Sequence, residues 1–379
     1  MSPAPALPKP IYDWLRLMVA RQASDLFITA GYAPALKLNG KVTPITKQTL
    51  TPTETSEMAK AVMSERQRSI FAGTKEANFA LSDPDIGRFR VNCFVQQGRV
   101  GIVFRLVNTK IPKAEDIHLP AIVNDLAMMP RGLVIVVGAT GSGKSTSLAA
   151  MVGYRNQHAQ DHIITVEDPI EFVHEHGSCI VTQREVGLDT DDWDSALKNT
   201  LRQAPDVIMI GEIRDRETMK HAMSYAETGH LCLSTIHANN ANQALDRILS
   251  FFGQERRDQL LLDLSLNLRA IISQRLVRRA DGKGRLPAVE VLLNSPLISD
   301  LIMKGRLDEI KDVMSRSREL GMTTFDQALF DLYKSGAISA EDALRHADSF
   351  NDLRLKIKLA GKDESGLSGL GDLPNLDIL

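Results

Sequence analysis

Residues 138–145 read G-x-x-x-x-G-K-S without a mismatch, a spacing that can hold a nucleoside triphosphate. Glycines let backbone N–H groups approach phosphate oxygens, and a helix that begins here adds the positive end of its dipole. Lys144 can reach the β- and γ-phosphates, and the Ser145 hydroxyl can bind Mg²⁺. A chance Gly-rich turn is the alternative, but the apolar run 133–137 before the loop and the helix-forming segment after it favour a phosphate loop. The predicted nucleotide-binding residues are Gly138, Ala139, Thr140, Gly141, Ser142, Gly143, Lys144, Ser145 and Thr146.

Two glutamates follow other apolar runs and are candidates for hydrolysis chemistry. Glu212 comes after the run 207–210, where a carboxylate can hold Mg²⁺ through its water shell; an acid that caps the next helix is the alternative. Glu171 follows the run 163–166 and a proline-containing turn, where it can orient an attacking water or simply be a surface acid. We predict that both are catalytic, with Ser145 and Glu212 as magnesium ligands.

His230 and His237 flank the fourth apolar run, 231–235. In a triphosphate site, a histidine at a strand end can sense the γ-phosphate. Zinc binding is a second possibility, but no cysteine or third histidine completes a ligand set. A structural histidine is a third possibility for either position. We include both histidines in the predicted catalytic set.

Arginines are concentrated in the strand-rich end of the first part of the chain. An arginine offered to the phosphates of a neighbouring subunit can raise a rate by about 10³–10⁵. Arg88, Arg90, Arg99 and Arg105 are the candidates for this trans-acting role. Each is also compatible with a solvated position on a strand face, and the residues alone do not choose among them.

These side chains need strands whose ends meet, and the four apolar runs provide candidates. In an open parallel sheet, ligands bind outside the carboxyl ends of the strands. If the runs share a sheet, the glycine loop, Glu171, Glu212 and His237 gather at one edge. The predicted fold class is α/β, with a phosphate-binding domain at 116–294, an α+β domain at 1–115, a helical region at 295–360 and a Gly/Ser-rich tail at 361–379 that is predicted to be disordered.

The first domain shows its own local signals. Thr51-Pro52-Thr53-Glu54 has the pattern of a capping box with proline at the first helical position, and it predicts a helix that continues to about Phe71. Residues 88–95 and 100–107 alternate β-branched and aromatic residues with polar ones, which predicts an antiparallel sheet.

The composition argues against several classes of protein. A formal net charge of −2 argues against a dominant nucleic-acid-binding surface. The three cysteines, Cys93, Cys179 and Cys232, form no CxxC pair, so neither a zinc loop nor a disulfide framework is predicted, and a cytoplasmic location fits. No apolar run approaches the ~20 residues of a membrane span.

Several longer stretches resemble a known family: 164–190, 197–215, 226–248, 24–31 and 87–94. They resemble the type IV pilus retraction ATPases, the PilT/PilU branch of the secretion ATPase superfamily, over about residues 11–359. The resemblance implies a RecA-like P-loop ATPase domain, a PAS-like N-terminal domain, and ATP with Mg²⁺ as the nucleotide. It also implies homohexameric rings in which arginines of the N-terminal domain reach the nucleotide.

The same resemblance gives roles to individual residues. Glu171 corresponds to the catalytic glutamate of the family's Asp box, and Glu212 corresponds to the Walker B glutamate. His230 and His237 correspond to the two positions of the His box. The resemblance also implies trans-acting roles among Arg90, Arg99 and Arg105, without choosing one of them.

Two departures narrow the position within the superfamily. Extension and type II secretion ATPases carry a four-cysteine zinc loop, and its absence here favours the retraction side. Residues 343–359 resemble the PilU subgroup, and residues 296–302 replace an AIRNLI-like segment of the PilT subgroup. An accessory motor is therefore expected, acting with a PilT-type ATPase and an inner-membrane platform protein at the cytoplasmic face of that membrane. A hexameric ATP-binding scaffold that strengthens a partner motor, with little turnover of its own, is the alternative.

Overall fold

The computed structural model describes residues 7–38, 40–107 and 109–360. The chain divides into two compact units. One comprises the residues up to Lys110 together with Glu171–Val173, and the other comprises Ile111–Ile170 and the residues from His174 onward. The predicted tail at 361–379 lies outside the described residues. The finer domain boundaries expected from the sequence stay a prediction.

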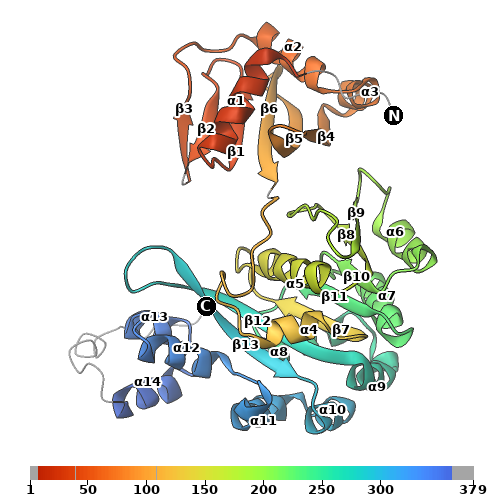
Figure 1. Cartoon of the computed structure of the whole chain (residues 1–379), viewed down its shortest axis with the longest axis vertical. Coiled ribbons are helices and arrows are strands. Elements are labelled where there is room, and N and C mark those ends of the chain that lie inside the picture. Colours follow the sequence, from red (N-terminus) through yellow and green to blue (C-terminus); the bar gives the residue numbers. More distant parts are fainter. Residues whose placement is uncertain (1–6, 39, 108, 361–379) are drawn as a thin grey trace. The chain divides into compact units, whose positions relative to one another are not determined.

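The first unit is built on a six-stranded antiparallel sheet in the order β3-β2-β1-β6-β5-β4 (Figure 1). Ile11, Leu15 and Met18 lie at helical spacing on α1 and are fully buried in this unit's core. The antiparallel sheet predicted for residues 88–107 is confirmed. The elements are α1 (Lys9–Ala20), β1 (Asp25–Thr29), β2 (Ala35–Leu38), β3 (Lys41–Pro44), α2 (Pro52–Val62), α3 (Glu65–Thr74), β4 (Glu76–Asp83), β5 (Gly87–Gln96) and β6 (Arg99–Val107).

The helix predicted to run to about Phe71 is wrong in its length, because two helices occupy the stretch. The capping box at Thr51 does start α2, since its side chain accepts a hydrogen bond from the backbone N–H of Glu54. Met63 is then extended, and Ser64 forms a second capping box that starts α3. The second start signal competes with continuation of the first helix.

The second unit contains a seven-stranded sheet in the order β13-β12-β7-β11-β10-β8-β9. All pairings are parallel except the β12–β13 hairpin. The strands are β7 (Gly132–Val137), β8 (His162–Glu167), β9 (Ile180–Glu185), β10 (Val207–Ile210), β11 (Leu231–Ile236), β12 (Leu268–Arg278) and β13 (Arg285–Leu293). The four apolar runs singled out in the sequence become the adjacent strands β7, β11, β10 and β8, as predicted.

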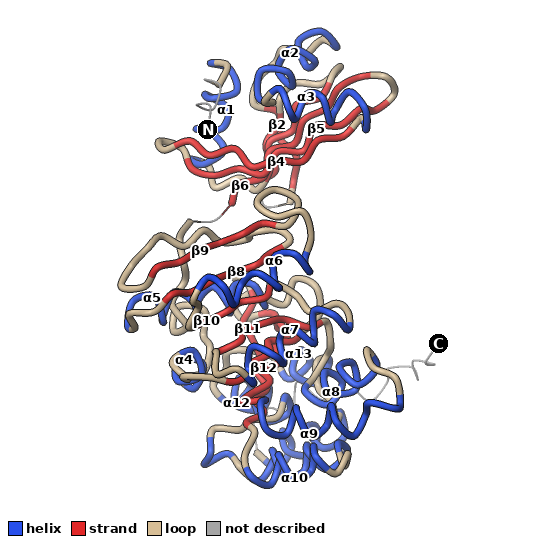
Figure 2. Tube along the Cα trace, turned by 90° about the vertical axis from the view of Figure 1, so that its right-hand side faces the viewer, coloured by secondary structure: helices blue, strands red, loops and turns tan. Residues whose placement is uncertain are grey.

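Helices cover both faces of this sheet (Figure 2). The helices around the sheet are α4 (Ile122–Ala127), α5 (Lys144–His158), α6 (Trp193–Thr200), α7 (Arg216–Glu227), α8 (Ala241–Ser250) and α9 (Arg257–Asn267). Strand β7 is buried throughout, and its side chains alternate between the two faces. Val134 and Val136 pack with α4 and α5, whereas Leu133, Ile135 and Val137 pack with α6 to α9. Burial on both faces explains why the strands are apolar without interruption.

Short helices follow the β12–β13 hairpin. They are α10 (Pro296–Met303), α11 (Ile310–Arg316), α12 (Phe325–Lys334), α13 (Ala340–Arg345) and α14 (Phe350–Leu359). Phe325, Leu329 and Leu353 form a separate core with Val277 and Ala288 of the hairpin. The hairpin thus joins the parallel sheet to the C-terminal helices. No helix in the described ranges is long and apolar enough to cross a membrane.

Candidate nucleotide site

The glycine loop connects the central strand β7 to helix α5. Gly138, Gly141 and Gly143 have φ angles of +154°, +77° and +95°, which L-residues with side chains rarely adopt. A Cβ atom on Gly138 would lie 2.3 Å from Ser142 Oγ and 2.7 Å from Gln274 O. The loop therefore needs glycine both for its backbone conformation and for its close approach to β12.

Lys144 is nearly buried at the start of α5. Its Nζ donates hydrogen bonds to the backbone oxygens of Gly138 at 2.9 Å and Ala139 at 3.1 Å. Burial lowers the pKa of Lys144, and the negative charge of Glu212 partly opposes this shift. The ammonium group is thus held over the loop, within the electrostatic influence of the acid that follows β10.

Glu212 and His237 meet at the carboxyl ends of β10 and β11. Glu212 Oε1 lies 3.0 Å from His237 Nε2. Its other oxygen, Oε2, accepts a hydrogen bond from Arg214 Nε at 2.8 Å, and this hydrogen bond raises the pKa of Arg214. Arg214 also lies 3.7 Å from Asp168 Oδ2, at the end of β8. Strand order therefore brings together Asp168, Glu212 and His237, which are 25 or more residues apart in the sequence.

A hollow of about 320 Å³ opens beside the glycine loop. Its walls combine the first loop residues with the segment that follows His237. Arg247 of α8 also faces it, so a cation stands opposite a loop built to bind phosphate. The lining residues are Gly138, Ala139, His237, Ala238, Asn239, Gln243 and Arg247.

His230 is not brought to this group. It precedes β11, and its backbone oxygen pairs with Gly132 at the start of β7, so it lies at the opposite edge of the sheet from the glycine loop of the same chain. Its Nδ1 lies 3.0 Å from Thr228 Oγ1 and 3.3 Å from Tyr225 O. These contacts fit a structural histidine, and a catalytic role for His230 stays a prediction.

Glu171 and the three candidate arginines belong to the first unit. Arg90 Nη2 lies 3.3 Å from Glu171 Oε1. Arg105 donates a hydrogen bond of 2.8 Å from its Nε to Oδ1 of the buried Asp25. Arg99 begins β6 and is exposed. The catalytic role of Glu171 and the trans-acting role of each arginine stay predictions.

Sequence reasoning missed Arg214 and Arg247. Arg214 stands two residues after Glu212, and this spacing was the available signal. Arg247 offered none, because it is one of two charged residues on an amphipathic helix whose outer face is solvated. Only the placement of α8 beside the loop distinguishes it.

Comparison with known proteins identifies the family to which the chain belongs. The model of the Type II/IV secretion system protein family matches residues 104–325. A type IV pilus ATPase, PilU of Pseudomonas aeruginosa, is 60% identical over 365 residues, covering 96% of each chain. The chain belongs to the PilT/PilU family of type IV pilus ATPases. PilT from the same organism is 38% identical over 337 residues, covering 89% of this chain and 98% of PilT.

Solved structures agree with the assignment. The crystal structure of the pilus retraction motor PilT with bound ADP superposes with a TM-score of 0.86 at 39% identity, covering 91% of this chain and 99% of that chain. The Legionella pneumophila ATPase DotB superposes with a TM-score of 0.73 at 26% identity, covering 95% and 98%. The predicted α/β fold, with a RecA-like P-loop ATPase domain, is confirmed. This family member is an ATPase associated with pilus retraction.

Proposed function

We propose that this chain is an ATP-hydrolysing ring motor that acts as a PilU-type accessory motor in pilus retraction and twitching motility. The observation that supports it best is the 60% identity to a PilU over 96% of the chain. The intact glycine loop and the Glu212–His237 contact at the adjacent strand ends support turnover of ATP by the chain itself.

The proposed hydrolysis divides labour among the strand ends. Lys144 exchanges its two carbonyl partners for phosphate oxygens, and the loop N–H groups hold the remaining charge. His237 senses the γ-phosphate from the end of β11. Glu171 orients the attacking water, and an arginine of Arg90, Arg99 and Arg105 reaches the nucleotide of a ring neighbour. In this scheme, each part of the reacting triphosphate is contacted by a different charged or polar group of the protein.

The donor set near the loop fits Mg²⁺. The Ser145 hydroxyl and the Glu212 carboxylate, the latter through water, are oxygen donors of the kind this ion prefers. Glu212 lies close enough to Lys144 that its charge opposes the effect of burial on the pKa of the lysine. When bound, the ion neutralises charge on the β- and γ-phosphates.

The proposed assembly is a homohexamer that has two protein partners and a membrane location. It works with a PilT-type retraction ATPase, contacts the pilus platform protein of the inner membrane, and sits at the cytoplasmic face of that membrane. The PilU and PilT matches support the partnership with a PilT-type ATPase. Mixing the chain with a PilT-type protein and following mass by light scattering, with and without ATP, tests it; two unchanged species would contradict it.

Steady-state ATPase rates test the catalytic assignment. Lys144→Ala and Glu171→Ala are each expected to lower kcat by at least about 10², since each removes a group that acts on the transition state. Glu175→Ala is the matched control, because Glu175 is an exposed acid of the same segment. Rates equal to wild type in both test variants would contradict the assignment.

A retraction assay in cells distinguishes the motor hypothesis from the scaffold alternative. If turnover matters, Lys144→Ala should fail to support retraction even when the partner motor is intact. If the chain serves as a scaffold, the same variant should retain full support at equal abundance. Retraction speed under load, measured by optical trapping, distinguishes the two outcomes.

A further inference from the structure

The loop that follows His237 separates two hollows. On one side is the hollow beside the glycine loop, and on the other is a polar hollow of about 540 Å³ among the C-terminal helices. Asn239 and Gln243 line both of them. A change in either hollow therefore acts on the same short segment.

Arg275 bonds this segment from the C-terminal side. It lies on β12, and its Nη2 donates a hydrogen bond of 3.2 Å to Asn239 O, two residues beyond His237. Its Nη1 donates a hydrogen bond of 2.6 Å to His346 O, and its Nη2 lies 2.6 Å from Asp348 Oδ1. One guanidinium group thus bonds the loop behind His237 and the segment between α13 and α14.

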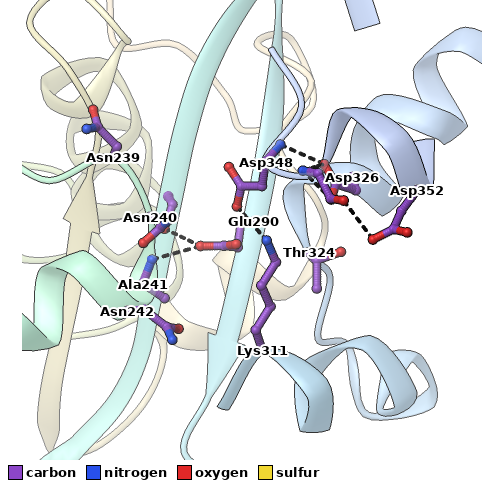
Figure 3. Close-up of polar contacts among 12 residues, drawn as sticks. Asn239, Asn240, Ala241, Asn242, Glu290, Lys311, Thr324, Asp326, Asp348 and Asp352 are labelled. Atoms are coloured by element: carbon purple, nitrogen blue, oxygen red, sulfur yellow. Dashed lines mark hydrogen bonds and ion pairs between the residues drawn. The ribbon is translucent and has the colours of Figure 1, made fainter. Parts of the chain in front are cut away.

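Packing and charge both fix this guanidinium. Its central carbon lies 3.9 Å from the centroid of the Phe325 ring, within the range of a cation–π contact. Asp348 is largely buried and is also bonded by Lys311 Nζ at 2.9 Å. The backbone N–H of Asp348 donates a hydrogen bond of 2.8 Å to Asp326 (Figure 3). Burial alone would raise the pKa of Asp348, but the hydrogen bond from Lys311 and the charge of Arg275 lower it. The carboxylate is therefore a charged, immobile anchor.

A second anchor holds the start of α8. Glu290 of β13 is 2% exposed, and its Oε1 accepts hydrogen bonds from Ala241 N at 2.8 Å and Ser273 Oγ at 3.0 Å. Figure 3 shows Glu290 between the loop and the side chains of Lys311 and Asp348. The helix start is thereby tied to the hairpin. Asn239, in the loop before this helix, is bonded to the hairpin through the hydrogen bond from Arg275 to its backbone oxygen.

We propose that Arg275 is a positioning residue for ATP hydrolysis, which, anchored by Asp348, holds the loop behind His237 in place and links that histidine to the C-terminal helices. This inference rests on the role proposed for His237. A misplacement of about 1 Å at a reacting group can cost about 10²-fold in rate. Releasing the Asn239 carbonyl frees the loop at a point two residues from the contact of His237 with Glu212.

Kinetics of the full-length protein test the proposal. Arg275→Gln is expected to lower kcat by about 10-fold or more while the KM for ATP changes by less than about threefold, because the glycine loop is untouched. Asp348→Asn, which keeps an acceptor but removes the charge, should lower kcat less. Arg279→Gln is the matched control, since Arg279 follows the same strand and, among the described residues, its side chain bonds only to Asp281. A wild-type kcat in both Arg275→Gln and Asp348→Asn would overturn the proposal.

A double variant separates positioning from a general structural effect. If Arg275 acts through His237, adding Arg275→Gln to His237→Ala should lower kcat by less than twofold further. Losses that multiply in full would overturn the proposal and leave the role of His237 standing. A wild-type kcat for His237→Ala would overturn both the positioning role of Arg275 and the catalytic role of His237. In that case, the loss of activity in Lys144→Ala would still identify the ATPase site. Melting curves for every variant show whether Arg275→Gln folds, and Asp348→Asn remains a test if it does not.

Discussion

A buried histidine predicts how stability changes with pH in the second unit. His174 is 7% exposed, and burial lowers its pKa from 6.5 to about 4. The folded chain keeps this imidazole neutral, but the unfolded chain protonates it below its ordinary pKa. Stability from this group is therefore fully present above pH 6.5 and falls as the pH drops toward 4. The difference of about 2.5 pKa units corresponds to a maximum of roughly 3.4 kcal/mol, of which about 2 kcal/mol is lost by pH 5.

Urea unfolding at pH 7 and pH 5 measures this loss. The chain has two tryptophans, Trp14 and Trp193, so a Trp14→Phe background makes fluorescence report on α6 of the second unit. In that background, the wild-type free energy of unfolding should fall by about 2 kcal/mol more than that of His174→Gln. The exposed His158 gives the control, since His158→Gln should retain the wild-type pH dependence. Equal losses in wild type and His174→Gln would refute the reasoning.

Three further predictions concern the second unit. Gly138→Ala should weaken binding of a fluorescent ATP analogue by at least about 30-fold, because the added Cβ would meet the backbone oxygen of Gln274. Gly141→Ala is the control: its Cβ would enter open space, so only the strain of the positive φ remains, about 1–2 kcal/mol or roughly tenfold in affinity. Glu290→Ala should lower the urea-unfolding free energy by about 2–4 kcal/mol by stranding two buried donors, whereas Glu290→Gln keeps the acceptor and should cost less than about 1 kcal/mol. Arg155→Leu should cost about 2–4 kcal/mol in the same assay, since it removes an ion pair with Asp161 at 2.6 Å and two carbonyl contacts.

The sequence predicts well which residues lie at the carboxyl ends of the parallel strands. Their positions follow from the local pattern of apolar residues and from one topological rule. Each apolar run is a strand that is buried on both faces, and in a parallel sheet the residue after each strand emerges on the same side. Glu212 and His237 could thus be placed near the glycine loop from the sequence alone. His230 could not be separated from His237 by motif alone, because a strand of six residues spans about 20 Å and puts its two ends at opposite edges.

The second side of the site could not be predicted. Gln274, Arg275 and Glu290 lie on a hairpin whose sequence shows only strand character, and their partners are distant in the chain. Arg275 contacts Asn239, 36 residues earlier, and His346, 71 residues later. No local pattern specifies such pairs, since they depend on how the C-terminal helices pack on the hairpin. The sequence likewise gave no reason to expect a buried carboxylate at the start of α8, because an acid in a strand usually faces solvent.

Glu212 connects the two sides, because His237 and Arg214 already contact its two oxygens and the proposed magnesium ion would be a third partner. In the structure it contacts His237 at 3.0 Å and Arg214 at 2.8 Å. If it serves Mg²⁺ through water, as proposed, the ion would compete with these two contacts for the charge of the carboxylate when a nucleotide arrives. Arg214 has Asp168 as a second partner, whereas His237 would turn to the γ-phosphate. Loss of that phosphate after hydrolysis would return His237 to Glu212 and move the loop that Arg275 holds. On these proposed roles, charge competition at one carboxylate would link the state of the nucleotide to the loop that Arg275 contacts, and through it to the C-terminal helices.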